Sequence, residues 1–264
     1  MLVEPVTDML DPARTIAIIP DRALHGLPFP ALRRPGRQEY LIQNFTIIVS
    51  PTLTHLLATN GGRPQRNAIV SFGSQNDDST EIRELTALKD FYPKAMTVAG
   101  HSVEKTNFLA AMNTAPVFHY AGHSVTDAVD PLRSSILLDG NRNGPNRVTA
   151  VDISRQRLWS NAIVVLSSCD SSVGNSRDGV GMRGLTSAFL IGGAGSVVGS
   201  LWPVEGSSTA DLMIRFHRAF ASAQMPVAQA LRRAQLDFLE AHPERSHPYY
   251  WSGFVVTGNF SALR

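Results

Sequence analysis

The chain has 264 residues, 43% of them hydrophobic, which is enough to build a core without disulfide staples. A formal net charge of +2, with basic residues scattered along the chain, gives no basis for binding nucleic acid. The single cysteine excludes an intramolecular disulfide and favours a reducing compartment. Because neither a signal peptide nor a membrane span is evident, we expect a cytoplasmic protein that does not engage a membrane.

Strand and helix patterns alternate along the chain. Apolar and β-branched runs predict strands at 15–19, 45–49, 68–72, 95–98, 116–123, 135–138, 162–169, 196–201 and 251–257. Helical patterns fall at 52–58, after 78, at 102–112, from 149, at 185–191, at 212–220 and after 226. This alternation is the signature of βαβ units and a parallel sheet. We expect residues 1–264 to form one α/β domain, the C-terminal domain of a longer protein.

Three signals locate the starts of helices. Ser50 followed by Pro51 predicts an N-cap and a first helical residue. Asp78 with Glu81 three residues later resembles a capping box, and Thr149 starts a further helix in the same way. An apolar stripe is predicted to face the core from the helix after Asp78, at Ile82, Leu85 and Leu88.

A short apolar run ends at the only cysteine, Cys169. Five consecutive apolar residues at 162–166 are too few for a core helix and suit a strand buried on both faces. Ligands and reactive groups in open α/β sheets gather at the carboxyl ends of the strands. Cys169 is therefore a candidate nucleophile, although a lone cysteine more commonly packs as a small hydrophobic residue.

A second strand of the same kind ends at His123, just before polar Ser124 and Thr126. A histidine within hydrogen-bond reach of a cysteine can generate the thiolate, the reactive form of a thiol whose free pKa is about 8.5. The two strand ends together predict a Cys–His pair.

Two other motifs fail in context. The segment 179–184 matches a dinucleotide fingerprint, but a polar segment separates it from the preceding strand, so its glycines are expected to shape a loop and to allow close helix packing. His119 and His123 have the spacing of zinc ligands on a helix, but along a strand, at about 3.3 Å per residue, they would lie too far apart to share an ion. We expect no metal and no cofactor, and interpret His119 as a packed strand residue without a catalytic role.

Several segments, in this order, resemble those of the CHAT domain family, a relative of caspases and separases. They are 19–29, 50–53, 119–123, 166–169, 179–185, 195–204 and 247–254, and the resemblance covers nearly the whole chain. It implies a bacterial protein with a caspase-like α/β fold, in which helices flank both faces of an open, mostly parallel sheet. It also implies a His–Cys dyad at His123 and Cys169, with the N–H groups of Gly122 and Cys169 as the oxyanion hole. Relatives often carry helical repeats before this domain.

The first substrate pocket is expected at Trp202 and Glu205, where relatives place substrate contacts. Many relatives carry two consecutive acids after the Trp-Pro-Val segment, whereas this chain has Glu205 and then Gly206. Glu205 could line the pocket or sit at the N-terminus of a helix, where acids complement the dipole.

Two functions follow from these residues. The first is a cysteine endopeptidase that cleaves a protein substrate and is regulated by a helical-repeat sensor or partner. The alternative is a catalytically silent, caspase-like scaffold for protein–protein interaction, and a test for hydrolysis after activation separates the two.

Overall fold

The computed structural model describes residues 6, 9–11, 14–33, 36–58, 65–73, 79–99, 103–127, 129–138, 146–170 and 180–259, without the side chains of 169, 170 and 180–183. The strands are β1 (Thr15–Ile18), β2 (Thr46–Val49), β3 (Ala68–Gly73), β4 (Lys94–Val98), β5 (Val117–Val125), β6 (Ser135–Leu137), β7 (Arg147–Thr149), β8 (Ala162–Asp170), β9 (Ala194–Ser200) and β10 (Phe254–Gly258). The α-helices are α1 (Leu41–Asn44), α2 (Leu53–Leu57), α3 (Ser79–Leu88), α4 (Lys105–Ala111), α5 (Ala150–Ser154), α6 (Val180–Ile191), α7 (Gly206–His217) and α8 (Val227–Ala241).

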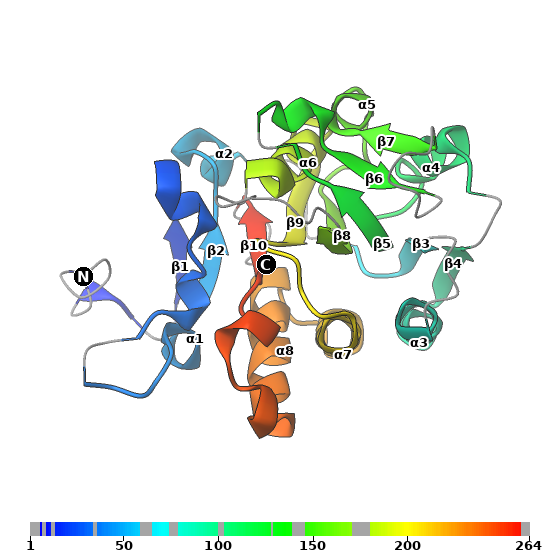
Figure 1. The fold of residues 1–264 in the computed structure, drawn as a ribbon. Helices are drawn as coiled ribbons and strands as arrows, with labels where there is room; N and C mark the ends of the chain where they lie inside the picture. The colour runs from blue at the N-terminus through cyan, green and yellow to red at the C-terminus, as the bar shows by residue number, and fades with distance from the viewer. Residues whose placement is uncertain are drawn as a thin grey trace.

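All of these strands belong to one sheet, in which β6 and β7 form a hairpin at its side. The main order is β1-β2-β10-β9-β8-β5-β3-β4, and the block from β9 to β4 is parallel. β10 runs antiparallel to β9 and parallel to β2. Helices α4, α5 and α6 lie on one side of the sheet and α3, α7 and α8 on the other, as Figure 1 shows. The predicted open, mostly parallel sheet with helices on both faces is confirmed.

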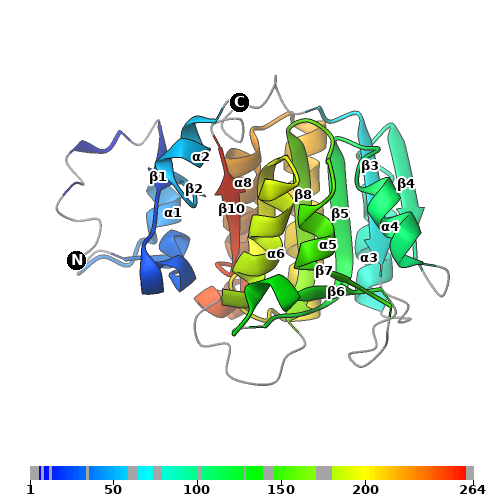
Figure 2. The same cartoon turned by 90° about the horizontal axis from the view of Figure 1, so that it is seen from above.

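The two faces of the sheet have separate cores, which explains the continuous apolar run of β8. Ile163 and Val165 join the cluster with α7 and α8, whereas Val164 and Leu166 join the cluster with α4, α5 and α6. All four are fully buried. Burial of each contributes about 1.5–3 kcal/mol relative to exposure. Figure 2 shows α5 and α6 lying over this part of the sheet.

The predicted stripe on α3 is right at two positions and wrong at the third. Leu85 and Leu88 are buried, but Ile82 is 52% exposed. A step of three residues turns an α-helix by about 300°, so Ile82 lies about 120° around the helix from Leu88. Glu84, only 2% exposed, takes the inward position instead.

The helix starts also divide into one correction and one confirmation. Thr52, and not Ser50, caps α2, because its Oγ1 accepts the N–H of His55 at 3.0 Å. At α5, Thr149 Oγ1 accepts the N–H of Asp152 at 3.2 Å and the Asp152 carboxylate accepts the N–H of Thr149 at 2.9 Å. These two reciprocal hydrogen bonds between Thr149 and Asp152 form the predicted capping box.

The β6–β7 hairpin extends the carboxyl end of β5. β6 runs antiparallel to β5, pairing Val125 with Ser135, and β7 pairs with β6. A strand was predicted at 135–138, where β6 lies, whereas β7 was not predicted. Residues 139–145, between β6 and β7, lie outside the described residues.

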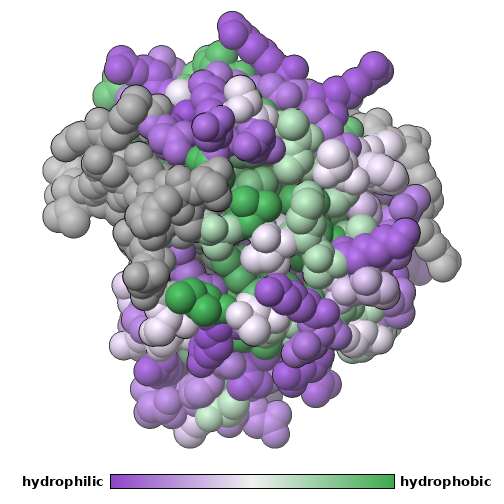
Figure 3. Space-filling view, turned by 90° about the vertical axis from the view of Figure 1, so that its right-hand side faces the viewer, coloured by the Kyte–Doolittle hydropathy of each residue, from purple (hydrophilic) through white to green (hydrophobic). Residues whose placement is uncertain are grey.

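The sheet ends at β4 on the side shown in Figure 3, where a hydrophobic strip lies between hydrophilic surfaces. Lys94 and Met96 of this edge strand are exposed. A lysine on an edge strand discourages pairing with another chain.

Candidate catalytic site

His123 and Cys169 lie on neighbouring parallel strands near their carboxyl ends. In the register of β5 and β8, Gly122 is opposite Ser168 and His123 is opposite Cys169. Neighbouring strands lie about 4.8 Å apart, so the backbones of both residues are within one strand spacing. The sequence predicted this neighbourhood from the two strand ends. The side chain of Cys169 lies outside the described residues, so the roles assigned to His123, Cys169 and the Gly122 amide stay predictions.

The backbone of His123 is held by Tyr120, a residue to which the sequence assigned no role. The hydroxyl of Tyr120 accepts the N–H of His123 at 3.0 Å and lies 2.6 Å from the carbonyl oxygen of Leu137, to which it can donate. Tyr120 is fully buried. One side chain thus fixes both the candidate catalytic residue and the first strand of the hairpin.

A carboxylate on α3 faces the ring of His123. Glu81 Oε1 lies 3.9 Å from His123 Nε2, and the two side chains are only 12% and 30% exposed. The sequence had predicted Glu81 as half of a capping box with Asp78, which lies outside the described residues. No spacing pattern in the sequence relates Glu81 to His123, because 42 positions of chain, including β4 and α4, separate them.

Beneath this site, four elements contribute to a buried chain of polar side chains. Its members are Ser167 of β8, Glu84 of α3, His119 of β5, His217 of α7 and Tyr92, and each is at most 5% exposed. Their successive contacts are Ser167 Oγ to Glu84 at 2.9 Å, Glu84 to His119 Nε2 at 3.0 Å, His119 Nδ1 to His217 Nε2 at 3.1 Å, and His217 Nδ1 to Tyr92 Oη at 2.7 Å. His119 was predicted as a packed strand residue, which is confirmed. His217, to which the sequence assigned no role, is fully buried.

Burial controls the protonation of this chain. Burial lowers the pKa of His217, and the neighbouring His119 lowers it further. Burial raises the pKa of Tyr92. Neutral imidazole at His217 and phenol at Tyr92 are therefore the favoured forms. One arrangement gives each hydrogen bond of the chain a donor: Tyr92 donates to His217, His217 to His119, and Ser167 to Glu84. The 3.0 Å approach of His119 Nε2 to Glu84 Oε1 is an ion-pair contact without the alignment of a hydrogen bond.

Trp202 and Glu205 follow β9, but their contacts are internal. The Trp202 indole N–H donates to the carbonyl of Tyr249 at 3.2 Å, and its ring packs on Gly253. The Glu205 carboxylate caps α7, because it accepts the N–H groups of Ser207 and Ser208 at 2.9 and 2.8 Å.

The electrostatics of Glu205 match this capping role. Burial alone would raise its pKa, but hydrogen bonds from Ser208 and Ser207 outweigh burial and lower the pKa of Glu205 to about 2. Arg245 Nη1 also lies 3.4 Å from the carboxylate. Of the two positions expected for Glu205, these contacts correspond to the N-terminus of a helix. A role of Glu205 in a substrate pocket stays a prediction.

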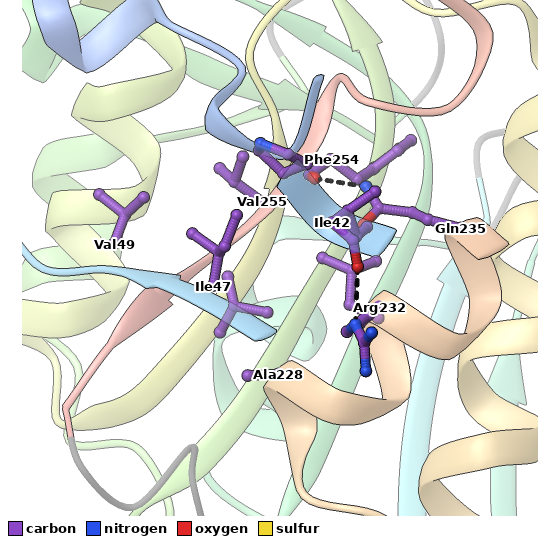
Figure 4. Close-up of a pocket in the computed structure, with 11 residues that line it drawn as sticks. Ile42, Ile47, Val49, Ala228, Arg232, Gln235, Phe254 and Val255 are labelled. Atoms are coloured by element: carbon purple, nitrogen blue, oxygen red, sulfur yellow. Dashed lines mark hydrogen bonds between the residues drawn. The ribbon is translucent and has the colours of Figure 1, made fainter. Parts of the chain in front are cut away.

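Two pockets lie away from β5 and β8. One is lined by β2, β9, β10 and α6, and includes Thr186 and Leu201. The other, in Figure 4, lies between β2, β10 and α8. There Arg232 donates to the carbonyl of Ile42 at 2.7 Å and Gln235 donates to that of Phe254 at 3.0 Å. These hydrogen bonds tie both polar side chains to backbone carbonyl groups at the edge of the second pocket.

The described part of the chain contains no group of three His, Cys, Asp or Glu side chains placed to hold a metal ion. None of its helices has both the length and the apolar content to cross a membrane.

The sheet and the helices that cover it have the caspase-like fold. Similar solved structures include separase in its complex with securin from Saccharomyces cerevisiae, with a TM-score of 0.59, 15% identity, and coverage of 89% of this chain and 14% of that chain. They also include the Arg specific cysteine proteinase gingipain R, with a TM-score of 0.53, 10% identity, and coverage of 83% and 55%. At these identities the likeness shows the fold alone.

The sequence defines the family within this class. The model of the CHAT domain matches residues 1–259, and the chain belongs to the CHAT domain family. A curated relative, Tetratricopeptide repeat protein 28 of Mus musculus, is 23% identical over 304 residues, which cover 93% of this chain and 12% of the relative. The chain thus spans about an eighth of the length of the curated relatives it matches.

Proposed function

We propose that this chain is a cysteine endopeptidase in which Cys169 is the nucleophile and His123 is the general acid and base. The observation that carries the proposal is the register of β5 and β8, which sets the two residues opposite each other near the carboxyl ends of adjacent parallel strands. Rigid strands are a suitable support for a dyad, because small displacements of reacting groups are costly.

The reaction would pass through a thioester. The Cys169 thiolate attacks the carbonyl carbon of the scissile peptide bond, and protonated His123 then transfers its proton to the leaving amine as the C–N bond breaks. Neutral His123 next takes a proton from water, the hydroxide attacks the thioester, and the acid product leaves as the thiolate is restored. The dyad returns to its starting protonation state, and one water is consumed for each bond cleaved.

The oxyanion of each tetrahedral intermediate needs hydrogen-bond donors. We assign them to the backbone N–H groups of Gly122 and Cys169, as the resemblance to caspases implies. A donor of this kind is worth about 2.7–4 kcal/mol to the transition state.

Regulation by a repeat region forms part of the same proposal. The name of the curated relative, a tetratricopeptide repeat protein, supports a helical-repeat sensor or partner that controls the peptidase, whose substrate would be a protein. We propose that residues 1–264 act as a single peptidase domain. This domain would be the C-terminal part of a longer protein that also carries the repeat region, and the protein would act in the bacterial cytoplasm. The same relative also suits a scaffold without catalysis, so the first experiment addresses catalysis.

The test is a peptide-library cleavage profile with the intact protein and its sensor region or partner. Cys169→Ala and His123→Ala should each abolish hydrolysis and leave the melting temperature within about 2 °C of the parent, since neither is proposed to hold the core. Asp90→Asn, an exposed change after α3, is the matched control. Undiminished cleavage by Cys169→Ala would disprove the mechanism, and absence of cleavage by the activated parent would favour the scaffold.

A further inference from the structure

The side chain of Glu81 is the described carboxylate nearest to the ring of His123. Glu81 Oε1 is 3.9 Å from Nε2 of His123, and both side chains are more than two-thirds buried. An ionised carboxylate at this distance favours imidazolium over imidazole. A Cys–His dyad needs this protonated form, because the thiolate of the resting enzyme is stabilised by the cation beside it.

Helix α3, which carries Glu81, is anchored one turn further along by Glu84. The two Glu84 oxygens contact His119 Nε2 of β5 at 3.0 Å and Ser167 Oγ of β8 at 2.9 Å. His119 is four residues before His123, and Ser167 is two residues before Cys169. One buried carboxylate therefore joins α3 to both strands that carry the candidate dyad.

The anchor is fixed from behind by α7. His217 contacts His119 at 3.1 Å and Tyr92 at 2.7 Å, and all three are buried. Buried hydrogen bonds in a low-dielectric interior favour one geometry, because each one that breaks leaves a buried group unsatisfied. The position of α3 relative to β5 is thus specified more sharply than apolar packing alone would specify it.

We propose that Glu81 is a positioning residue for His123, held in place by the anchor of α3 at Glu84. Glu81 orients the imidazole through its Nε2 side and favours its protonated form, and Glu84 keeps α3 close enough for that contact. This inference rests on the proposed dyad and adds a third, acidic member to it.

Alkylation of Cys169 by iodoacetamide tests the inference without a peptide substrate. The chain has one cysteine, so an adduct that intact mass spectrometry finds in the parent and not in Cys169→Ala reports on Cys169. Glu81→Gln should slow alkylation at pH 7 by about three- to tenfold, because loss of a nearby negative charge lowers the fraction of the ion pair. Asp90→Asn removes an acid with no contact to His123 and should leave the rate unchanged.

The anchor needs two variants of its own. Glu84→Ala removes both contacts and should slow alkylation as much as Glu81→Gln, at a temperature well below its melting point. Glu84→Gln keeps an acceptor for His119 and a partner for Ser167, so it should restore most of the rate even if Glu84→Ala folds poorly. Where turnover is measurable, Glu81→Gln should lower kcat and leave KM nearly unchanged.

The outcomes separate this inference from the proposed dyad. If His123→Ala slows alkylation but Glu81→Gln reacts at the parent rate, the positioning role is wrong and the dyad stands. If His123→Ala has no effect, the dyad fails and the role of Glu81 fails with it. A Glu81→Gln variant that melts earlier but alkylates normally assigns Glu81 a purely structural role and overturns the inference.

Discussion

His119 Nδ1 lies 3.1 Å from Nε2 of His217, although 98 positions of chain separate the two residues. The contact joins β5 to α7 within the apolar layer on one side of the sheet. Two imidazole rings can share a hydrogen bond only if one donates and the other accepts. Their orientation therefore depends on the groups at the two ends of the chain, Glu84 and Tyr92.

Replacement of His217 by phenylalanine should destabilise the protein. The ring volume is roughly kept, but His119 Nδ1 and the Tyr92 hydroxyl both lose a buried partner, at a combined cost of about 2–4 kcal/mol. Urea unfolding followed by circular dichroism measures the loss. The double variant His217→Phe/Tyr92→Phe should cost less than the sum of its single variants, because the second change removes a group already left unpaired. Strict additivity would show that the two side chains are not coupled.

Tyr120→Phe should loosen the backbone at His123. Loss of the hydroxyl removes the acceptor of the His123 N–H and the contact with Leu137, at an expected cost of about 1–3 kcal/mol. Hydrogen exchange at the His123 amide should accelerate. Tyr249→Phe, at a 42% exposed position, is the control and should alter neither stability nor exchange. An unchanged exchange rate in Tyr120→Phe would mean that another group holds this amide.

The fold and the neighbourhood of the candidate dyad could be predicted because they follow from local signals. An apolar run of strand length identifies a buried strand, and the carboxyl ends of parallel strands meet at one edge, which brings His123 to Cys169. The continuous apolar run of β8 was a particularly clear signal, since both faces of that strand are covered.

The polar chain could not be predicted, since each member looks ordinary in its own segment. A glutamate on a helix is normally exposed, and Glu84 is buried only because His119 and Ser167, from strands far along the chain, give it partners. The prediction that Ile82 faces the core was wrong because these partners turn the Glu84 side of α3 inward and leave Ile82 exposed. Pairings between distant segments are set by tertiary packing, and periodicity within one segment carries no information about them.

Gly184→Ala should destabilise the protein despite the better helix propensity of alanine. Gly184 lies in α6, and a Cβ there would clash with the carbonyl oxygen of Pro131, a backbone atom that cannot rotate away. The gain in propensity is about 1 kcal/mol, whereas overpacking of this kind typically costs about 1–3 kcal/mol, so the net change is a loss. The close approach confirms for Gly184 the expected close packing, whereas the loop expected at 179–184 is wrong from Val180 onward, where α6 begins.

Gly206→Ala is the matched control for this substitution. A Cβ at Gly206, the first residue of α7, would meet Thr80 Oγ1 at an ordinary 3.5 Å. Thermal melting of both variants should show a lower midpoint for Gly184→Ala alone. Equal melting of the two would mean that α6 can shift away from Pro131 at little cost.

Glu205→Gln separates capping from substrate recognition. The pKa of Glu205 in the folded protein is about 2, below its ordinary value of 4.5, so its ionised form stabilises the fold above pH 4.5. That contribution is lost as the pH falls from 4.5 through 2. The variant should therefore lose about 1 kcal/mol of stability at pH 7, typical of an N-cap and limited by solvent screening at this partly exposed site, and almost nothing near pH 2.

Rates for Arg, Met and Asp reporter peptides give the second readout for Glu205→Gln. A loss confined to the Arg peptide would assign Glu205 to the pocket, whereas an unchanged ranking, which its contacts with Ser207 and Ser208 favour, would restrict it to the helix terminus.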